Sequence, residues 1–544
     1  MIPINRLPNE LLSAIFMYQT GPFSPVLNLR VDGSTQIGWI ALTHVCRHWR
    51  NVALDTPGLW TSPDFSHPAL GLEMLKRSKE APLTINYLPF LTQKGWPVVI
   101  QALTHISHIA NLKLFEKPAF LSVAIAILTQ PAPELRKLHF ASPSLPTEDG
   151  TSGIIFLPRA FLANHAPRLT HLEFDNCHIP WDSTLFWNIS SLTCLAIRLG
   201  GEALYIRPTH RELLDILTKM PCLTKLELEG AAVPSRQSEQ PHAMIPVNIP
   251  NLRVLCFGGS TIPDCLALLE RTAVPDTAIV EFQWCKFEAS SRSEMVEELR
   301  QFAPALKKIL DGSGAEKYSI TSLELGIDGM ELGDLVLKSW TTCAIPPSLD
   351  CCVAGSCVRD PNPYRLRVEV RWKSETSFTF DDVVQAILPS LALDELQELG
   401  VQHDSETFLA PTLSKFFGFL PNLTDLSVWG DVLYDFVPLL RQHSTNTVVE
   451  ISSTGFQTSS ALAFPVLEKL TLKYIDFRFD QGLLDSFLDA YRYRKEHHLA
   501  IDAIEVYNCR LSDKQSSLLD REFDGEDYVR HKDELCDLSE DEEE

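Results

Sequence analysis

The chain has 544 residues, 45% of them hydrophobic, and a formal net charge of −23. This length exceeds one ordinary hydrophobic core, so we expect several domains or an array of repeats. The acidic excess argues against nucleic acid as a partner, because nucleic-acid binding needs a clustered basic surface. No run of 18 apolar residues and no signal-peptide pattern at the first residues are found, so we expect no membrane partner and a cytoplasmic or nuclear location.

The first elements expected along the chain are two short amphipathic helices. Pro8 stands at an opening helical position, where a missing N–H costs little, and apolar residues follow at helical spacing: Leu11, Leu12, Ile15 and Phe16. A second apolar stripe contains Leu42, Val45, Cys46, Trp49 and Val52, before Thr56-Pro57-Gly58 ends the helix. Two helices of this length can hardly bury so much apolar surface against each other, which favours a partner.

The residues of this segment also resemble a known module. Leu7-Pro8-x-Glu10-Leu11, Val45-Cys46-x-x-Trp49-Arg50 and Leu59-Trp60 together resemble an F-box, which docks a substrate receptor onto the Skp-type adaptor of a cullin–RING ubiquitin ligase. The resemblance implies that the adaptor-binding or module-core residues are Leu7, Pro8, Leu11, Ile15, Leu42, Val45, Cys46 and Trp49. Residues 17–38 depart from the family's short link between the two helices and can re-shape docking. The alternative is that both helices only cap the next domain.

Beyond residue 109 an LxxLxL-like apolar triplet recurs, with a mean spacing near 33 residues. The last two apolar residues of each copy alternate as in a short strand with an inward face. The thirteen copies begin at Ile109, Leu135, Leu169, Leu192, Leu223, Leu252, Thr277, Ile320, Arg365, Leu396, Leu423, Leu467 and Ile501. Amphipathic segments between copies predict helices at 262–273, 293–310, 381–393 and 483–498. Such units stack because a single one cannot bury its apolar face.

The predicted fold class is therefore α/β, with a helical F-box-like domain at 1–66 and a leucine-rich-repeat-like solenoid of parallel strands and outer helices at 67–523. The array resembles the repeats of many F-box proteins, including fungal families. The alternative, a doubly wound α/β domain, would show continuous Val and Ile strands without a fixed register. Residues 231–248 and 341–363 are expected to be loops. Residues 524–544 hold 11 acids against 2 bases, which predicts a solvated, disordered tail.

The sequence contains no phosphate loop, no dinucleotide fingerprint and no GxSxG elbow, so we expect no enzyme and no cofactor. His44 and His48 have the i, i+4 spacing of a zinc pair, but the general-base Glu is missing. Cys343, Cys351, Cys352 and Cys357 match no CxxC pair. We therefore predict no metal. A basic patch around Arg492, Arg494 and Lys495 is expected to solvate a helix end.

Six of the thirteen residues between the last two apolar positions of the copies are Glu. Glu281, Glu324 and Glu369 come from consecutive copies, so a parallel sheet would place them on neighbouring strands. One interpretation is an acidic groove for a basic target segment, with Trp429 and Tyr507 as aromatic anchors. The alternative is an ordinary solvated strand face on which salt screens the repulsion.

Together these features predict the substrate-recognition subunit of an SCF-type ubiquitin ligase, with the F-box on the adaptor and the repeats on an unknown target protein. The reaction itself would belong to other subunits, and tethering would raise the local concentration of the target. A second hypothesis is a protein-binding scaffold that no longer engages a ligase. A third is an enzyme with an atypical site.

Overall fold

The structure is a computed structural model. It describes residues 7–19, 38–88, 93–143, 155–200, 206–238, 246–312, 318–326, 333–341, 364–372, 378–402, 410–443, 448–452, 455–459, 462–523 and 528–531. The chain divides into two compact units. Unit 1 comprises residues 1–252 and 267–274, and unit 2 comprises residues 253–266 and 275–544. Among the described residues, no helix combines the length and the apolar character needed to cross a bilayer.

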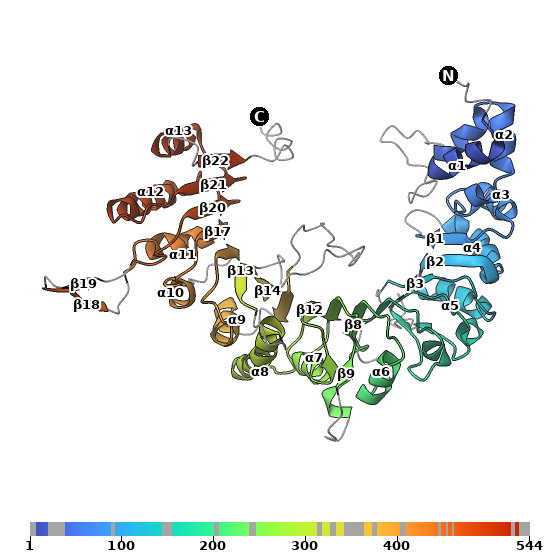
Figure 1. The fold of residues 1–544 in the computed structure, drawn as a ribbon, viewed down its shortest axis with the longest axis horizontal. Coiled ribbons are helices and arrows are strands. Elements are labelled where there is room, and N and C mark those ends of the chain that lie inside the picture. The colour runs from blue at the N-terminus through green and yellow to red at the C-terminus, as the bar shows by residue number, and fades with distance from the viewer. Residues whose placement is uncertain are drawn as a thin grey trace. The chain divides into compact units, whose positions relative to one another are not determined.

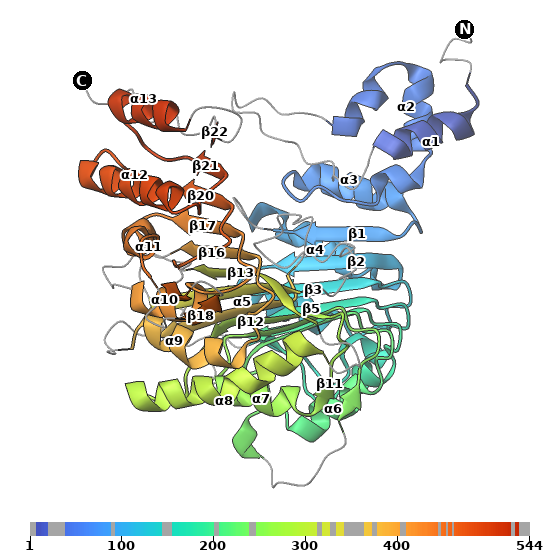
Figure 2. The ribbon, with the colours of Figure 1, turned by 60° about the vertical axis from the view of Figure 1, so that its left-hand side comes forward.

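Unit 1 begins with short helices and continues as a parallel sheet. The helices are α1 (Asn9–Gln19), the 3-10 helix η2 (Gly38–His44), α2 (Arg47–Leu54), the 3-10 helix η3 (Pro57–Trp60) and α3 (Pro68–Ser78). The strands, in spatial order, are β1 (Leu83–Tyr87), β2 (Ile109–Phe115), β3 (Lys137–Ala141), β5 (His171–Asp175), β7 (Cys194–Leu199) and β8 (Lys225–Gly230). All neighbouring pairs are parallel, as the stacked arrows of Figure 2 show.

Helices and short strands connect these strands. They include α4 (Trp96–Leu103), α5 (Pro118–Ile127) and α6 (His210–Leu217), together with the two-residue strands β4 (Ile155–Phe156) and β6 (Cys177–His178). Inward residues of each strand are buried; on β2 these are Leu112 and Leu114. Burial of this apolar row holds the strands to their helices, because each strand alone leaves one face unpaired.

Unit 2 repeats the pattern with one interruption. Its strands, in spatial order, are β10 (Val254–Gly258), β12 (Ile279–Cys285), β15 (Leu366–Trp372), β14 (Gly333–Thr341), β13 (Ile320–Gly326), β16 (Glu398–Gln402), β17 (Asp425–Trp429), β20 (Lys469–Lys473), β21 (Ala503–Tyr507) and β22 (Tyr528–His531). The pairs are parallel except at β14, which runs antiparallel to both β13 and β15. Strand β15 therefore pairs with β12, and β13 pairs with β16. The order of β13, β14 and β15 in the sheet is the reverse of their order in the sequence.

Helices follow most strands of unit 2 and lie along one side of them, as Figure 1 shows for α10 to α13. They are α8 (Arg292–Asp311), α9 (Phe380–Ile387), α10 (Ala410–Phe417), α11 (Val432–Leu439), α12 (Gln481–Glu496) and α13 (Asp513–Glu522); α7 (Ile262–Leu269) follows β10. The four helices predicted from amphipathic segments are confirmed as α7, α8, α9 and α12. Side-chain capping fixes several starts; Thr209 before α6, Thr379 before α9 and Ser512 before α13 each form a capping box.

All thirteen predicted repeat copies lie on strands of these sheets, so the strand prediction is confirmed. The fold class is likewise mixed α/β, with a helical N-terminal region followed by leucine-rich-repeat-like strand and helix units. Strands β1, β14 and β22 were not predicted. Strand β14 was missed although Leu332, Leu335 and Leu337 form the same LxxLxL triplet as the thirteen predicted copies.

Three expectations need correction. The expected disordered tail is wrong at Tyr528–His531, which forms β22 and pairs in parallel with β21, because an uncovered edge strand offers backbone groups to any extended segment nearby. Arg494 does not solvate a helix end, since it is fully buried. The pair His44 and His48 does not share one helix, because η2 ends at His44 and α2 begins at Arg47. The four loop cysteines lie outside the described residues.

Candidate functional site: the exposed apolar face of α1

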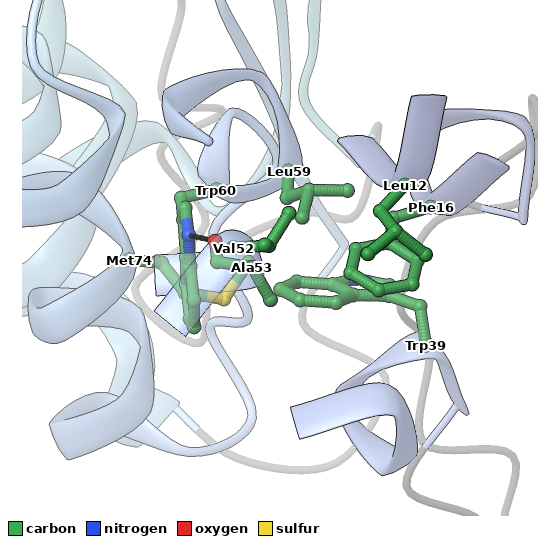
Figure 3. Close-up of a cluster of buried hydrophobic side chains, with 8 residues drawn as sticks. All are labelled: Leu12, Phe16, Trp39, Val52, Ala53, Leu59, Trp60 and Met74. Atoms are coloured by element: carbon green, nitrogen blue, oxygen red, sulfur yellow. Dashed lines mark hydrogen bonds between the residues drawn. The ribbon is translucent and has the colours of Figure 1, made fainter. Parts of the chain in front are cut away.

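The N-terminal helices enclose a small core of their own. Figure 3 shows its eight buried side chains: Leu12, Phe16, Trp39, Val52, Ala53, Leu59, Trp60 and Met74. The indole of Trp60 meets that of Trp39 edge-on at 4.9 Å between ring centroids, and its Nε1 donates a hydrogen bond to the carbonyl of Ala53 at 2.9 Å. The aromatic residues therefore fix how η2, α2 and η3 pack, since each ring buries a large apolar area.

Helix α1 uses one of its sides for this core and leaves another exposed. Leu12 and Phe16, one helical turn apart, are fully buried. Leu11 and Ile15, one position earlier in each turn, are 52% and 40% exposed. With Leu7, Ala14 and Tyr18 they line a shallow apolar recess of about 370 Å³. We call Leu7, Leu11, Ala14, Ile15 and Tyr18 the α1 face.

The second predicted helix is broken at Cys46, which changes the role of several motif residues. Cys46 is not inside a helix but is the N-cap of α2, where its Sγ accepts a hydrogen bond from the backbone N–H of Trp49 at 3.5 Å. Val45 precedes this cap and is 57% exposed. The single continuous helix predicted from 42 to 52 is therefore wrong, because the cap at Cys46 starts a new hydrogen-bonded segment.

The structure separates seven of the eight predicted adaptor residues into two groups, and the eighth, Cys46, is the partly buried N-cap of α2. Pro8, Leu11, Ile15 and Val45 are exposed, so they are available to a partner. Leu7, Leu42 and Trp49 are partly buried against the core of the helices, and Trp49 contacts Phe16 with ring centroids 5.1 Å apart. Sequence reasoning missed Ala14 and Tyr18, although both follow Leu11 at helical spacing, i+3 and i+7.

The outward face of the strands is the second predicted site, and its glutamates are arranged differently from the prediction. Glu281 pairs in register with Arg367, and Glu324 pairs with Lys338 on one side and with Gly400 on the other. Because β14 and β15 lie between β12 and β13, the three predicted glutamates do not form a continuous acidic row. The expectation that they lie on neighbouring strands in register is therefore wrong.

Each of these glutamates also has a partner within the chain. Glu281 accepts hydrogen bonds from Tyr364 and from Gln283, Glu324 binds Lys338 Nζ at 2.8 Å, and Glu369 pairs with Arg367. Glu281 and Glu369 are buried, each only 4% exposed. A target segment could reach them only by displacing these partners, so their role in target binding stays a prediction that the geometry does not favour.

The aromatic anchors occupy one row of the unit 2 sheet. Trp429, Lys473 and Tyr507 are neighbours in register on β17, β20 and β21. The Lys473 Nζ lies 4.3 Å from the Trp429 ring centroid and 5.7 Å from that of Tyr507. The two rings thus already hold a cation of this chain between them.

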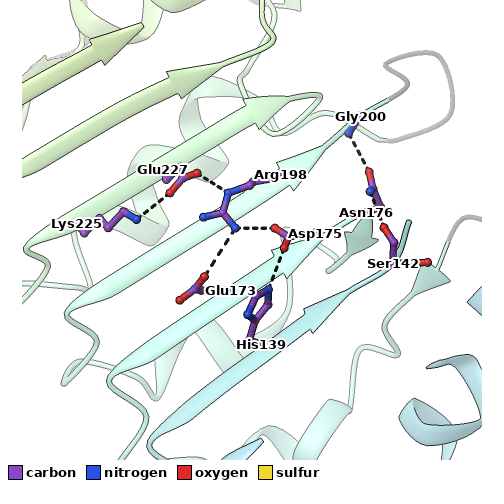
Figure 4. A network of polar contacts seen from close by, with 9 residues as sticks. All are labelled: His139, Ser142, Glu173, Asp175, Asn176, Arg198, Gly200, Lys225 and Glu227. Carbon is purple, nitrogen blue, oxygen red and sulfur yellow. Dashed lines mark hydrogen bonds and ion pairs between the residues drawn. The ribbon is translucent and has the colours of Figure 1, made fainter. Parts of the chain in front are cut away.

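Unit 1 carries a polar network on the same kind of strand face, drawn in Figure 4. Arg198 on β7 contacts Asp175 at 2.6 Å, Glu173 at 3.7 Å and Glu227, while Lys225 binds Glu227 at 3.0 Å. The pKa of the Asp175 carboxyl is lowered: although burial alone would raise it, the His139 hydrogen bond and the Arg198 charge prevail. Charges on this face are mostly balanced internally, which leaves little acidic surface here for a basic ligand.

Residues 4–66 match the family model described as F-box-like, so this segment is an F-box-like domain. No curated protein matches the chain. Among solved structures, the chain is similar to one described as "Crystal structure of TLR13-ssRNA13 complex", with 11% identity and a TM-score of 0.28. That match covers 84% of this chain and 63% of the other. Within the described residues, no group of three or more His, Cys, Asp or Glu side chains is placed to hold a metal ion.

Proposed function

We propose that the chain is the substrate-recognition subunit of an SCF-type cullin–RING ubiquitin ligase. In this proposal the α1 face and Val45 bind a Skp-type adaptor, and the strand and helix units bind the target protein. The chain performs no chemistry itself and acts in the cytoplasm or nucleus, with neither nucleic acid nor membrane as a partner. The observation that carries the proposal is the exposed apolar α1 face within the F-box-like domain.

The physical argument rests on unpaired apolar surface and on charge. Leu11, Ile15 and Tyr18 expose apolar side chains on the side of α1 that faces away from the core. Exposed apolar patches of this kind mark protein interfaces. Residues 1–66 contain four bases and four acids, so their net charge is zero. Docking should therefore be driven by apolar burial and should depend little on salt.

The test is adaptor binding by the full chain with single charge insertions. Leu11→Asp and Val45→Asp should each weaken adaptor binding at least about a hundredfold, since a desolvated unpaired carboxylate costs several kcal/mol. The matched control is Val123→Asp on α5, which changes the same kind of exposed apolar side chain away from the helices of the F-box-like domain. Wild-type affinity in both variants, or an equal loss in the control, would reject the adaptor site and favour a scaffold without a ligase.

A further inference from the structure

The outward face of unit 2 contains a recess that follows from the sizes of the side chains in register. Gly400, Ser427 and Thr471 are neighbours in register on β16, β17 and β20. These small residues form a low central row. Bulkier residues stand two positions before and after them on the same strands: Glu398, Asp425 and Lys469 on one side, and Gln402, Trp429 and Lys473 on the other. Trp340 and Glu324 lie at the β13 and β14 end, and the space enclosed is about 370 Å³.

The floor of this recess is set by Gly400. A Cβ added at this position would lie 3.0 Å from Cζ3 and 3.1 Å from Cη2 of the Trp429 ring. The absence of a side chain therefore lets the indole lean over the central row. An alanine here would force the ring to move, which makes Gly400 a site for testing the recess without changing any charge.

The charged groups around the recess are not all paired within the chain. Lys469 binds Glu505 at 2.9 Å and Lys338 binds Glu324 at 2.8 Å, which neutralises four of them. Three remain. Among the residues that the structure describes, no carboxylate lies within 4.0 Å of Lys473 Nζ, and no cation lies within that distance of Glu398 or Asp425. Glu398 and Asp425 accept hydrogen bonds only from the hydroxyls of Ser322 and Thr424.

These unpaired charges are separated by sign across the recess. Glu398 and Asp425 are neighbours in register at one end of their strands, and like charges side by side repel. Lys473 stands four residues further along its strand than Lys469, which is level with Asp425. Four strand residues span about 13 Å. Burial lowers the pKa of Lys473, in part offset by the more distant Glu324 and Glu505 and reinforced by Lys469. A nearby anion would therefore stabilise its charged form.

We infer that this recess is a target-recognition subsite for a short extended peptide segment that carries one basic and one acidic side chain four residues apart, with a small residue between them. The basic side chain binds Glu398 and Asp425, the small residue lies over Gly400 and Ser427, and the acidic side chain binds Lys473. The spacing follows because residues i, i+2 and i+4 of an extended chain share one face and span the same ~13 Å. This inference rests on the proposed function for the statement that the segment belongs to a target.

The test uses the full chain labelled with 15N-tryptophan and an acetylated, amidated heptapeptide of sequence Gly-Lys-Gly-Ala-Gly-Glu-Gly. Trp340→Phe and Trp429→Phe variants assign the two indole N–H signals. We expect the peptide to shift both signals and to bind about fivefold more tightly than versions with two Lys or two Glu, because each single-sign peptide loses one exposed charge pair. Lys473→Gln should remove the preference over the two-Lys peptide, Asp425→Asn should reduce the preference over the two-Glu peptide, and Gly400→Ala should weaken all peptides. The matched control is Lys113→Gln on the outward face of β2, which should change nothing.

Either of two results with the wild-type chain would overturn the inference: indole signals that do not move at millimolar peptide, or equal binding of the three peptides. An equal loss in Lys113→Gln would also reject it. Adaptor binding by Lys473→Gln and Asp425→Asn should stay at the wild-type level. If Leu11→Asp keeps adaptor binding while the mixed peptide still binds the recess, the proposed ligase function fails and the peptide site stands.

Discussion

The Arg494 guanidinium shows how a charged side chain becomes part of the core. It lies on α12, fully buried, and donates hydrogen bonds to the carbonyls of Ala463 and Phe464 at 2.7 Å and of Leu440 at 3.4 Å. Burial lowers its pKa to about 10, so it is still charged at neutral pH. Its function here is to satisfy carbonyls that would otherwise be buried without a donor.

Replacing Arg494 with Leu should therefore reduce the free energy of unfolding by about 3 kcal/mol, since two well-formed hydrogen bonds to buried carbonyls are lost. The matched control is Arg492→Leu, two residues away. Arg492 is partly exposed and pairs with Glu522 at 2.9 Å, so its loss should cost less than about 1 kcal/mol. Urea unfolding of the two variants measures the difference. Equal midpoints would show that the Arg494 hydrogen bonds contribute nothing net.

At the scale of single elements, the short strand β6 holds a histidine in its neutral form. The His178 side chain is 3% exposed, and its Nε2 donates to the carbonyl of Ile206 at 3.0 Å. Burial lowers its pKa below the ordinary 6.5, although the Ile206 hydrogen bond acts in the opposite direction. The unfolded chain therefore binds a proton at a higher pH than the folded chain does, and acidification favours unfolding.

The stability that neutral His178 contributes is present above pH 6.5 and is lost as pH falls below that value toward its folded pKa. Between pH 7.5 and pH 5.5 the loss should reach up to about 1 kcal/mol. His178→Gln should reduce this pH dependence relative to the wild-type chain. Denaturant unfolding at the two pH values gives the comparison. An unaltered pH slope in His178→Gln would contradict this role.

The break between η2 and α2 is also decided at the scale of elements. The stripe of Leu42, Val45 and Trp49 suggested one helix, because periodicity alone does not detect a cap. Cys46 has extended backbone angles and its Sγ accepts the Trp49 N–H, so the helix restarts there. This restart leaves Val45 exposed while Trp49 packs on Phe16.

At the scale of the whole molecule, the core of the F-box-like domain crosses the predicted boundary at residue 66. Met74 on α3 belongs to the same buried cluster as Trp60, and Arg77 of α3 lies 4.6 Å from the Trp60 ring centroid. The backbone N–H of Thr84 on β1 donates to the carbonyl of Thr61 at 2.8 Å. The helices of the N-terminal module are therefore continuous with the first strand of the repeats, and we expect no independent unfolding at residue 66.

Trp60→Ala should thus destabilise the helices and β1 together, by about 3 to 5 kcal/mol. Trp187→Ala is the matched control, because Trp187 is exposed. Lys219 Nζ lies over its ring, 4.0 Å from the ring centroid. Removal of the Trp187 ring should cost no more than about 1 kcal/mol. Limited proteolysis of both variants tests the expectation: Trp60→Ala should open cleavage sites in residues 59–87, and Trp187→Ala should not. Accumulation of a fragment starting near residue 67 in the wild type would contradict a shared core.

The sequence by itself determined the strands of the thirteen repeat copies and the face that each of them buries. Leu112, Leu226 and Leu470 could be placed on the inward face, because the two-residue period of a strand and the hydrophobic character of each side chain can both be seen in the local sequence. The same reasoning placed an F-box-like pair of helices at the N-terminus and found Leu11 and Ile15. The order of strands in space lay beyond it, because β14 enters as an antiparallel hairpin and separates strands that are consecutive in the repeat pattern.

Only the tertiary structure decided which charges meet. Glu281, Glu324 and Glu369 looked like an acidic row because their positions in the repeat are equivalent, yet register across β14 and β15 brings Arg367 and Lys338 to them. The same register places the small residues Gly400, Ser427 and Thr471 side by side and puts Lys473 at the other end of the strands from Glu398 and Asp425. The alternation of side chains depends only on the sequence of one strand. Charge pairing depends on neighbouring strands, which backbone hydrogen bonds bring together from distant parts of the chain.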